Sequence, residues 1–110
     1  MAEPGHAFVA GGVIALASAG AALGAPDADR QAELLHRLRH DCGSCHGMTM
    51  AGGLGPALLP AALEGRRDEE LARIVLDGIP RTPMPPWRFE ITEDEALWLV
   101  GQLKEGLDED

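Results

Sequence analysis

Two thiols and an imidazole stand close together near the middle of the chain, at Cys42, Cys45 and His46. The pattern Cys-x-x-Cys-His is the arrangement to which a c-type haem is attached. This spacing suits the chemistry, because two thiols must reach two vinyl groups on one porphyrin edge while the next imidazole reaches the iron. The motif predicts one covalently attached haem c with His46 as its proximal ligand. It uses both cysteines of the sequence, so none is left for a disulfide.

A close cysteine pair has two other common uses in proteins. A thioredoxin-like redox motif belongs in a strand-helix-strand unit, whereas the sequence around Cys42 predicts a helix before the pair and a glycine-rich loop after it. A structural zinc site needs four nitrogen or sulfur ligands in two spaced pairs, and only His36 and His40 could complete it. These histidines lie one turn apart on the preceding helix, where a solvated face accounts for them. The surroundings therefore favour haem.

A second iron ligand is predicted at Met84, which lies in a stretch with four prolines between positions 80 and 86. Proline fixes φ and removes a backbone donor, so we expect an extended, stiff and non-helical segment. A separation of 37 residues from His46 is enough chain to reach the opposite face of a porphyrin. Met48 and Met50 follow His46 too closely for that path, and we expect them to pack in the haem pocket.

Other residues are candidates for the surroundings of the haem. A histidine ligand usually donates its second ring N–H to a carbonyl or carboxylate, and the carbonyl of Pro56, in a loop over residues 47–60, is the expected acceptor. A simple turn at this proline is the alternative. Trp87 could pack against the porphyrin and donate its indole N–H to a propionate or to the loop, or it could be a core residue. Arg66 and Arg67 are candidate propionate partners or exposed charges.

The rest of the pattern is helical. Apolar residues recur at helical spacing from Leu34 to Cys45, with Arg37 on the other side and Asp29 as a suitable N-cap. Residues 58–63 favour a short helical turn. A second helix begins with the acidic run 68–70 and ends at Gly78.

A final helix begins with a capping box at Thr92 and Glu95. Its main apolar stripe has the i, i+3, i+4, i+7 spacing of one helix face and consists of Ala96, Leu99, Val100 and Leu103. Trp98 lies beside this stripe and is expected to contact the first helix, with a surface for docking a partner as the alternative. Gly101 next to it is expected to allow a close helix crossing.

Composition limits the possible partners. With 110 residues and a formal charge of −9, the chain predicts one small domain and argues against nucleic-acid binding, which needs a basic face. A protein partner with a basic or mixed surface fits better. A small chain also has limited capacity to bury a core, and the sequence holds only two Trp, two Phe and no Tyr. A porphyrin would supply the missing apolar centre.

The N-terminal segment favours export. Residues 8–25 carry no charge and are rich in small and apolar residues, so residues 1–24 are predicted to be a signal peptide cleaved after the small residues near Gly24. The segment has Glu3 and no basic residue at its start. An uncleaved anchor is the alternative, although its many Gly and Ala make it weakly hydrophobic for a membrane span. Export agrees with the motif, because c-type haem is attached outside the cytoplasm.

Together these features resemble the small single-haem class I cytochromes c. That resemblance implies an all-α fold, with three main helices and loops wrapped around one covalent haem, and residues 25–110 as a single cytochrome c domain. The runs 41–49, 52–58 and 78–87 are similar to the NirC cytochromes, small periplasmic proteins encoded beside cytochrome cd nitrite reductase of denitrifying bacteria. By matching position, Cys42 and Cys45 would attach the haem, and His46 and Met84 would be its axial ligands.

One departure concerns the last helix. Many class I cytochromes carry an aromatic residue deep in this helix, where Gln102 stands in this sequence, whereas Trp98 lies a turn earlier. The contact between the first and last helices therefore differs in detail from the usual pattern.

Three functions are consistent with this site. The first is a monomeric periplasmic electron carrier without catalytic residues, because two axial ligands leave no open site on the iron; the resemblance implies cytochrome cd nitrite reductase as its partner. The second is a redox partner of an enzyme in haem d maturation. The third is a gas-binding or sensing haem protein in which Met84 is displaceable.

Overall fold

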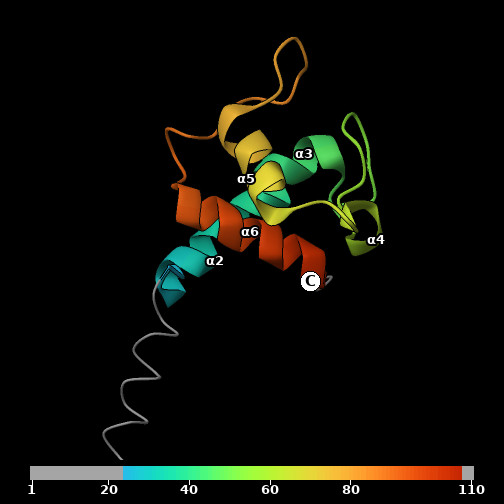
Figure 1. Ribbon diagram of the computed structural model, residues 1–110. Helices are drawn as coiled ribbons and strands as arrows, with labels where there is room; N and C mark the ends of the chain where they lie inside the picture. Colours follow the sequence, from blue (N-terminus) through green and yellow to red (C-terminus); the bar gives the residue numbers. More distant parts are fainter. Residues whose placement is uncertain (1–23, 108–110) are drawn as a thin grey trace, which may run out of the picture.

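The computed structural model describes residues 24–107, and the regular elements in that part of the chain are all helical (Figure 1). In chain order they are α2 (Ala28–Arg37), the π-helical segment η1 (Leu38–Cys42), α3 (Gly43–His46), α4 (Pro60–Leu63), α5 (Asp68–Asp77) and α6 (Glu93–Glu105). Because α2, η1 and α3 are continuous, they form one long first helix. The predicted all-α fold with three main helices is confirmed. The predicted signal peptide lies outside the described residues except for Gly24.

The ends of the helices follow from local side-chain chemistry. The side chain of Asp27 accepts a hydrogen bond of 2.9 Å from the backbone N–H of Arg30, so Asp27 is the N-cap of α2. The prediction of Asp29 was wrong, because the helix begins before it and places Asp29 in the first turn, where its charge still favours the helix dipole. The capping box between Thr92 and Glu95 is confirmed at the start of α6.

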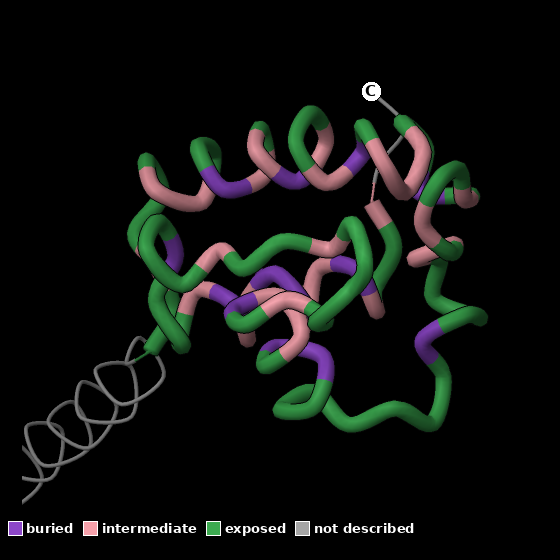
Figure 2. The backbone as a smooth tube through the Cα atoms, turned by 90° about the horizontal axis from the view of Figure 1, so that it is seen from above, coloured by how far each residue is buried: buried purple, intermediate pink, exposed green. Residues whose placement is uncertain are grey.

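The hydrophobic core lies where the first helix, α5 and α6 meet. α5 packs extensively on α6, which also contacts α2, and Figure 2 shows that the connecting loops are largely exposed. The predicted apolar stripe of α6 is buried. The buried apolar residues of the described chain include no aromatic side chain; they are Leu34, Leu38, Met50, Leu63, Leu71, Ala72, Leu76, Ile91, Ala96, Leu99, Val100 and Leu103.

Trp98 and Gly101 of α6 were both expected at a helix contact, but their surroundings differ. Trp98 is half-buried and packs against the core. The prediction that Gly101 allows a close helix crossing was wrong, since a Cβ atom added to it would meet nothing within 4 Å. Within residues 24–107, no helix has the length and apolar character needed to cross a membrane.

Candidate haem site

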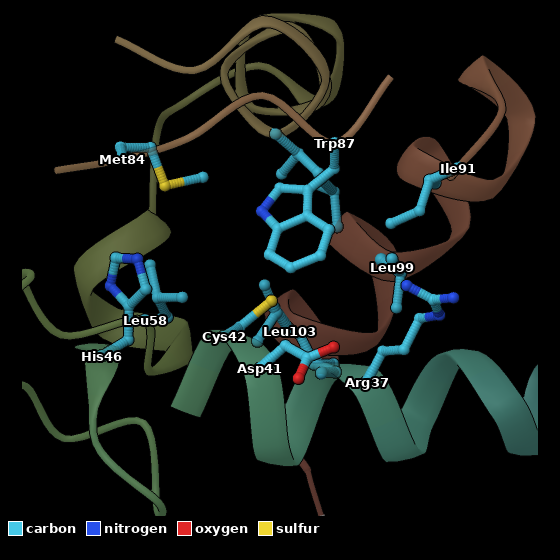
Figure 3. A pocket seen from close by; sticks show the side chains of 13 residues that line it. Arg37, Asp41, Cys42, His46, Leu58, Met84, Trp87, Ile91, Leu99 and Leu103 are labelled. Carbon is cyan, nitrogen blue, oxygen red and sulfur yellow. The ribbon is translucent and has the colours of Figure 1, made fainter. Parts of the chain in front are cut away.

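A small, largely apolar pocket opens between the first helix, the chain that follows α5, and α6 (Figure 3). Four residues predicted from the sequence lie on its wall: Cys42, His46, Met84 and Trp87. The other lining residues are Arg37, Leu38, Asp41, Leu58, Val75, Ile91, Leu99, Val100 and Leu103.

The first thiol of the motif is positioned by an unusual turn. Cys42 ends the π-helical segment, in which the N–H of Gly43 donates to the carbonyl of Leu38, five residues back. Such wide turns insert one extra residue into a helix and are frequent at functional sites. The sequence pattern did not predict this turn, because apolar spacing over so few residues fits α- and π-helix alike. Leu38 and Cys42 both face the pocket as a result.

Two charged residues that sequence reasoning missed also line the pocket. Arg37 was expected on the solvent side of the first helix, yet it lines the pocket together with Asp41. Arg37 lies three residues after the buried Leu34, a spacing that makes the two residues neighbours on one helix face. Arg37 also forms an ion pair with Glu90 from the chain before α6.

The imidazole of His46 is fixed by the backbone of the following loop. Its Nδ1 atom lies 2.7 Å from the carbonyl oxygen of Pro56, so the hydrogen bond expected from the sequence is present. Because a carbonyl can only accept, Nδ1 must carry the proton, which leaves the lone pair of Nε2 available for a metal. Such a bond also sets the ring orientation and raises the basicity of a ligand.

Close approach to this ring requires a residue without a side chain at position 55. A Cβ atom on Gly55 would lie 2.8 Å from Cε1 and 2.9 Å from Nδ1 of His46. The same glycine donates its N–H to the carbonyl of Cys45 over 2.8 Å. The 47–60 loop is therefore folded back directly onto the Cys-x-x-Cys-His motif, and Pro56 contributes through His46 rather than through the pocket wall.

Met84 is held by a closed loop that begins where α5 ends. Gly78 caps α5 with φ of 68°, and a Cβ atom there would lie 2.7 Å from the carbonyl oxygen of Met84. Ile79 donates its N–H to the same carbonyl over 3.2 Å. Gly78 was correctly predicted as the C-cap. Its lack of a side chain also lets the loop segment around Met84 lie against the helix end.

The hydroxyl of Thr82 ties this loop together. It donates to the carbonyl of Ile79 at 2.8 Å and accepts from the N–H of Met84 at 3.3 Å. Arg81 turns the chain with a left-handed φ of 64°. The loop is non-helical, as predicted, but it is turned rather than extended, because these side-chain hydrogen bonds fold it between its prolines.

The side chains of the pocket have a simple arrangement. Figure 3 shows the thioether of Met84 and the imidazole of His46 at one side, with the indole of Trp87 projecting toward the middle and Cys42 below it. The backbone N–H of Trp87 donates to the carbonyls of Val75 and Leu76, each at 3.1 Å. α5 therefore holds the tryptophan in place against the pocket.

The free thiol of Cys42 has low reactivity. Burial raises its pKa to about 11, with smaller contributions from the charge of Asp41 and from Cys45. The thiol is therefore protonated at neutral pH, and its sulfur is available for thioether formation only after the proton is removed. Cys45 lies in α3 directly before His46. It is half-buried and lies outside the pocket wall.

Several expectations about the pocket were wrong. Met48 is 60% exposed, and Met50 is buried in the protein core, and neither lines the pocket. The reason is the tight turn after His46, in which the N–H of Met50 donates to the carbonyl of Gly47 and turns both side chains away. Arg66 and Arg67 are exposed and lie outside the pocket wall, which agrees with the alternative of exposed charges; Arg66 forms an ion pair with Glu70.

The histidine pair of the first helix stays at the surface. The rings of His36 and His40 have centroids 4.3 Å apart and both residues are exposed. Among residues 24–107, no group of three or more His, Cys, Asp or Glu side chains could hold a metal ion. These observations agree with a solvated helix face.

The residues present fit a c-type haem. An apolar pocket, a thiol on its wall, an imidazole with an available nitrogen and a thioether meet there, and Gly55 leaves room for the imidazole. A family model described as cytochrome c oxidase, cbb3-type, subunit III matches residues 26–101. The chain belongs to this family of c-type cytochromes, in which the cofactor is covalently bound haem c.

Comparison with individual proteins narrows the class. Cytochrome c55X of Pseudomonas aeruginosa is 59% identical over 81 residues, which are 74% of this chain and 68% of that protein. Cytochrome c55X of Paracoccus denitrificans is 50% identical over 91 residues, 83% of this chain and 88% of that protein. The solved structure of the c-type cytochrome NirC is 57% identical and covers 73% of this chain and 94% of its own, with a TM-score of 0.71.

A larger protein shares part of the chain. Dihydro-haem d1 dehydrogenase of Pseudomonas aeruginosa is 35% identical over 65 residues, which are 59% of this chain but only 13% of that protein. The chain is thus a small c-type cytochrome related to NirC and cytochrome c55X. Like these small relatives it is an electron-transfer protein rather than an enzyme.

Proposed function

We propose that this chain is a single-haem electron carrier of the periplasm, which delivers electrons to cytochrome cd nitrite reductase in denitrification. One observation carries the proposal: His46, oriented by the carbonyl of Pro56, and Met84, held by its closed loop, lie on the same apolar pocket. The similarity to NirC supports the physiological setting.

Each predicted site residue has a role in this proposal. Cys42 and Cys45 would attach the haem covalently, and His46 and Met84 would hold its iron. Pro56 orients the imidazole, and Trp87 packs against the ring. When bound, the haem supplies a one-electron couple between Fe(III) and Fe(II). Two axial side chains leave no open position for a substrate, while the thioether and the apolar wall favour the reduced state.

The surroundings of the site suit a carrier that meets a protein partner. Residues 1–24 are proposed to be removed as a signal peptide, so that residues 25–110 act as a monomeric domain without a membrane span. The formal charge of −9 favours a partner with a basic surface and disfavours nucleic acid.

A second candidate function rests on the similarity to dihydro-haem d1 dehydrogenase. Its solved structure with DHE is 30% identical and has a TM-score of 0.60, over 66% of this chain and 16% of that one. A small cytochrome that resembles part of this dehydrogenase could exchange electrons with it during haem d maturation. The same haem and the same kind of docking face would serve either partner.

Two measurements test these proposals. The reduced protein is exposed to carbon monoxide, and a closed His46–Met84 pair predicts no rapid binding. Rapid stoichiometric binding would favour the gas-binding function instead. The reduced protein is then mixed in stopped flow with oxidised cytochrome cd nitrite reductase. Electron transfer too slow to sustain turnover of the reductase would rule out the donor role and favour the maturation role.

A further inference from the structure

A fully exposed aromatic residue stands next to the pocket. Phe89 has 94% of its surface exposed, the largest value among the exposed large apolar residues of the described chain. It lies in a short helical turn in which Glu90 and Ile91 both donate their N–H groups to the carbonyl of Trp87. Because a large apolar side chain gains free energy by leaving water, this exposure calls for an explanation.

The turn directs its residues to opposite sides. In a helical turn, residues four apart share a face and the residue between them points away. Trp87 and Ile91 face the pocket, which Figure 3 also shows. Phe89 therefore lies on the outer side of the pocket wall, one helical turn from the residues that enclose the cofactor.

Ion pairs connect the turn to a helix on each side. Arg88 forms an ion pair with Asp77 of α5 at 2.6 Å, and Glu90 forms one with Arg37 of the first helix. The guanidinium of Arg30 also donates to the carbonyl of Glu90 over 2.9 Å. Single exposed ion pairs are weak, but here they act together with the backbone bonds of the turn. Phe89 is thus presented on an ordered support, and its docking would require little additional ordering.

The charges beside this turn indicate the chemistry of its partner. Glu93 and Asp94 are exposed in the first turn of α6, close after Phe89 in the chain. The whole chain carries a formal charge of −9. Arg88 and Glu90 flank Phe89, and each forms an ion pair with an opposite charge. An apolar side chain followed closely by acidic residues is complementary to an apolar pocket surrounded by basic side chains.

We infer that Phe89 is the central anchor of the surface on which the redox protein partner docks, and that it inserts into an apolar pocket with a basic rim. This inference rests on the proposed function, because it takes the partner to be one of the two enzymes named there. In each encounter one electron passes between the two proteins, from the reduced cytochrome to oxidised nitrite reductase or from the reduced dehydrogenase to the oxidised cytochrome. No bond forms or breaks and no proton moves.

The test compares two exposed apolar residues in the haem-loaded protein. Phe89→Ala removes the proposed anchor, and Leu54→Ala removes a side chain that is 75% exposed in the loop after His46. Each reduced protein is mixed in stopped flow with oxidised cytochrome cd nitrite reductase, and each oxidised protein is mixed separately with reduced dihydro-haem d1 dehydrogenase. Truncation of an anchor is expected to lower the second-order rate constant about tenfold or more, whereas Leu54→Ala stays within about twofold of the parent.

Two further readouts separate docking from damage to the haem site. The reduction potential and the rate of oxidation by ferricyanide, a small inorganic oxidant, are expected to be the same in Phe89→Ala and the parent. In the double variant Glu93→Gln, Asp94→Asn, the reaction with the protein partner should become less sensitive to salt, while Phe89 still acts as an anchor.

The possible results distinguish failure of the docking inference from failure of the proposed function. If the parent exchanges electrons with one enzyme and Phe89→Ala does so equally fast, the docking inference is wrong and the proposed function stands. If the parent reacts with neither enzyme, both are wrong. A parent that sediments as a dimer, and becomes a monomer in Phe89→Ala, would show that a second copy covers this residue instead.

Discussion

The carbonyl oxygen of Pro56 lies 2.7 Å from Nδ1 of His46, ten residues earlier in the chain. This relationship decides which ring nitrogen carries the proton and how the imidazole faces the pocket. It depends on Gly55, whose hydrogen atom occupies the space beside the ring where a side chain would collide.

Gly55→Ala is expected to push His46 away from Pro56, because the new Cβ would lie 2.8 Å from Cε1 of the ring. Overpacking of this kind typically destabilises a protein by about 1–3 kcal/mol. Thermal unfolding and the yield of haem-loaded protein measure the effect. As a control, Gly101→Ala places a Cβ in open space within α6 and should stabilise the protein by about 0.5–1 kcal/mol. Equal behaviour of the two variants would contradict the close approach at Gly55.

Met84→Ala is expected to open the sixth position of the iron. The reduced variant should bind carbon monoxide stoichiometrically where the parent does not, and its reduction potential should fall because the thioether is lost. Absorption spectroscopy and a redox titration measure both effects. Met48→Ala is the control, since Met48 is 60% exposed and lies outside the pocket. Carbon monoxide binding by Met48→Ala and not by Met84→Ala would reverse the assignment.

Thr82→Val removes the two hydrogen bonds that close the Met84 loop while it keeps the shape of the side chain. Each such bond is typically worth about 1 kcal/mol, so Met84 should leave ferric iron more readily. The loss of the sulfur-to-iron charge-transfer absorption with rising pH should shift to lower pH. Thr82→Ser retains the hydroxyl and should behave like the parent. If Val and Ser variants titrate alike, the hydroxyl does not position Met84.

The acid stability of the protein should depend on Glu95. A two-point contact with the guanidinium of Arg30, at 2.8 and 3.1 Å, is the main reason that the pKa of Glu95 is lowered to about 2. The carboxylate accepts from the backbone of Thr92 as well. A lowered pKa stabilises the folded state fully above the ordinary value of 4.5, and this contribution is lost as the pH falls toward 2.

Glu95→Gln should therefore reduce stability at neutral pH, by about 1–3 kcal/mol for hydrogen bonds to a charged group. The difference from the parent should shrink between about pH 4.5 and pH 2. Denaturant unfolding at several pH values measures it. Glu93→Gln changes an exposed residue of the same turn and should leave the acid profile nearly unchanged. A difference between parent and Glu95→Gln that is constant across this range would exclude the linkage.

Local chemistry was readable from the sequence where it depends on neighbouring residues. The motif from Cys42 to His46, the capping box at Thr92 and the glycine end of α5 each need only a few adjacent side chains. The hydrogen bond between His46 and Pro56 was also predicted, since a ligand imidazole usually donates its second ring N–H to a nearby carbonyl or carboxylate. Errors arose where the path of the backbone, and not the residue type, determines the position of a side chain. Met48 and Met50 were placed in the pocket, and the turn after Gly47 directs them elsewhere.

The sequence by itself determined the cofactor chemistry, because two thiols and an imidazole at fixed spacing need no tertiary structure to be recognised. It also determined the helical pattern that places Met84 in a separate loop. The tertiary structure decided which charges face the pocket, since the packing of the first helix against the rest of the chain places Arg37 and Asp41 on the wall. It also decided that Phe89 is exposed rather than buried, because ion pairs with α5 and the first helix fix the direction of its turn.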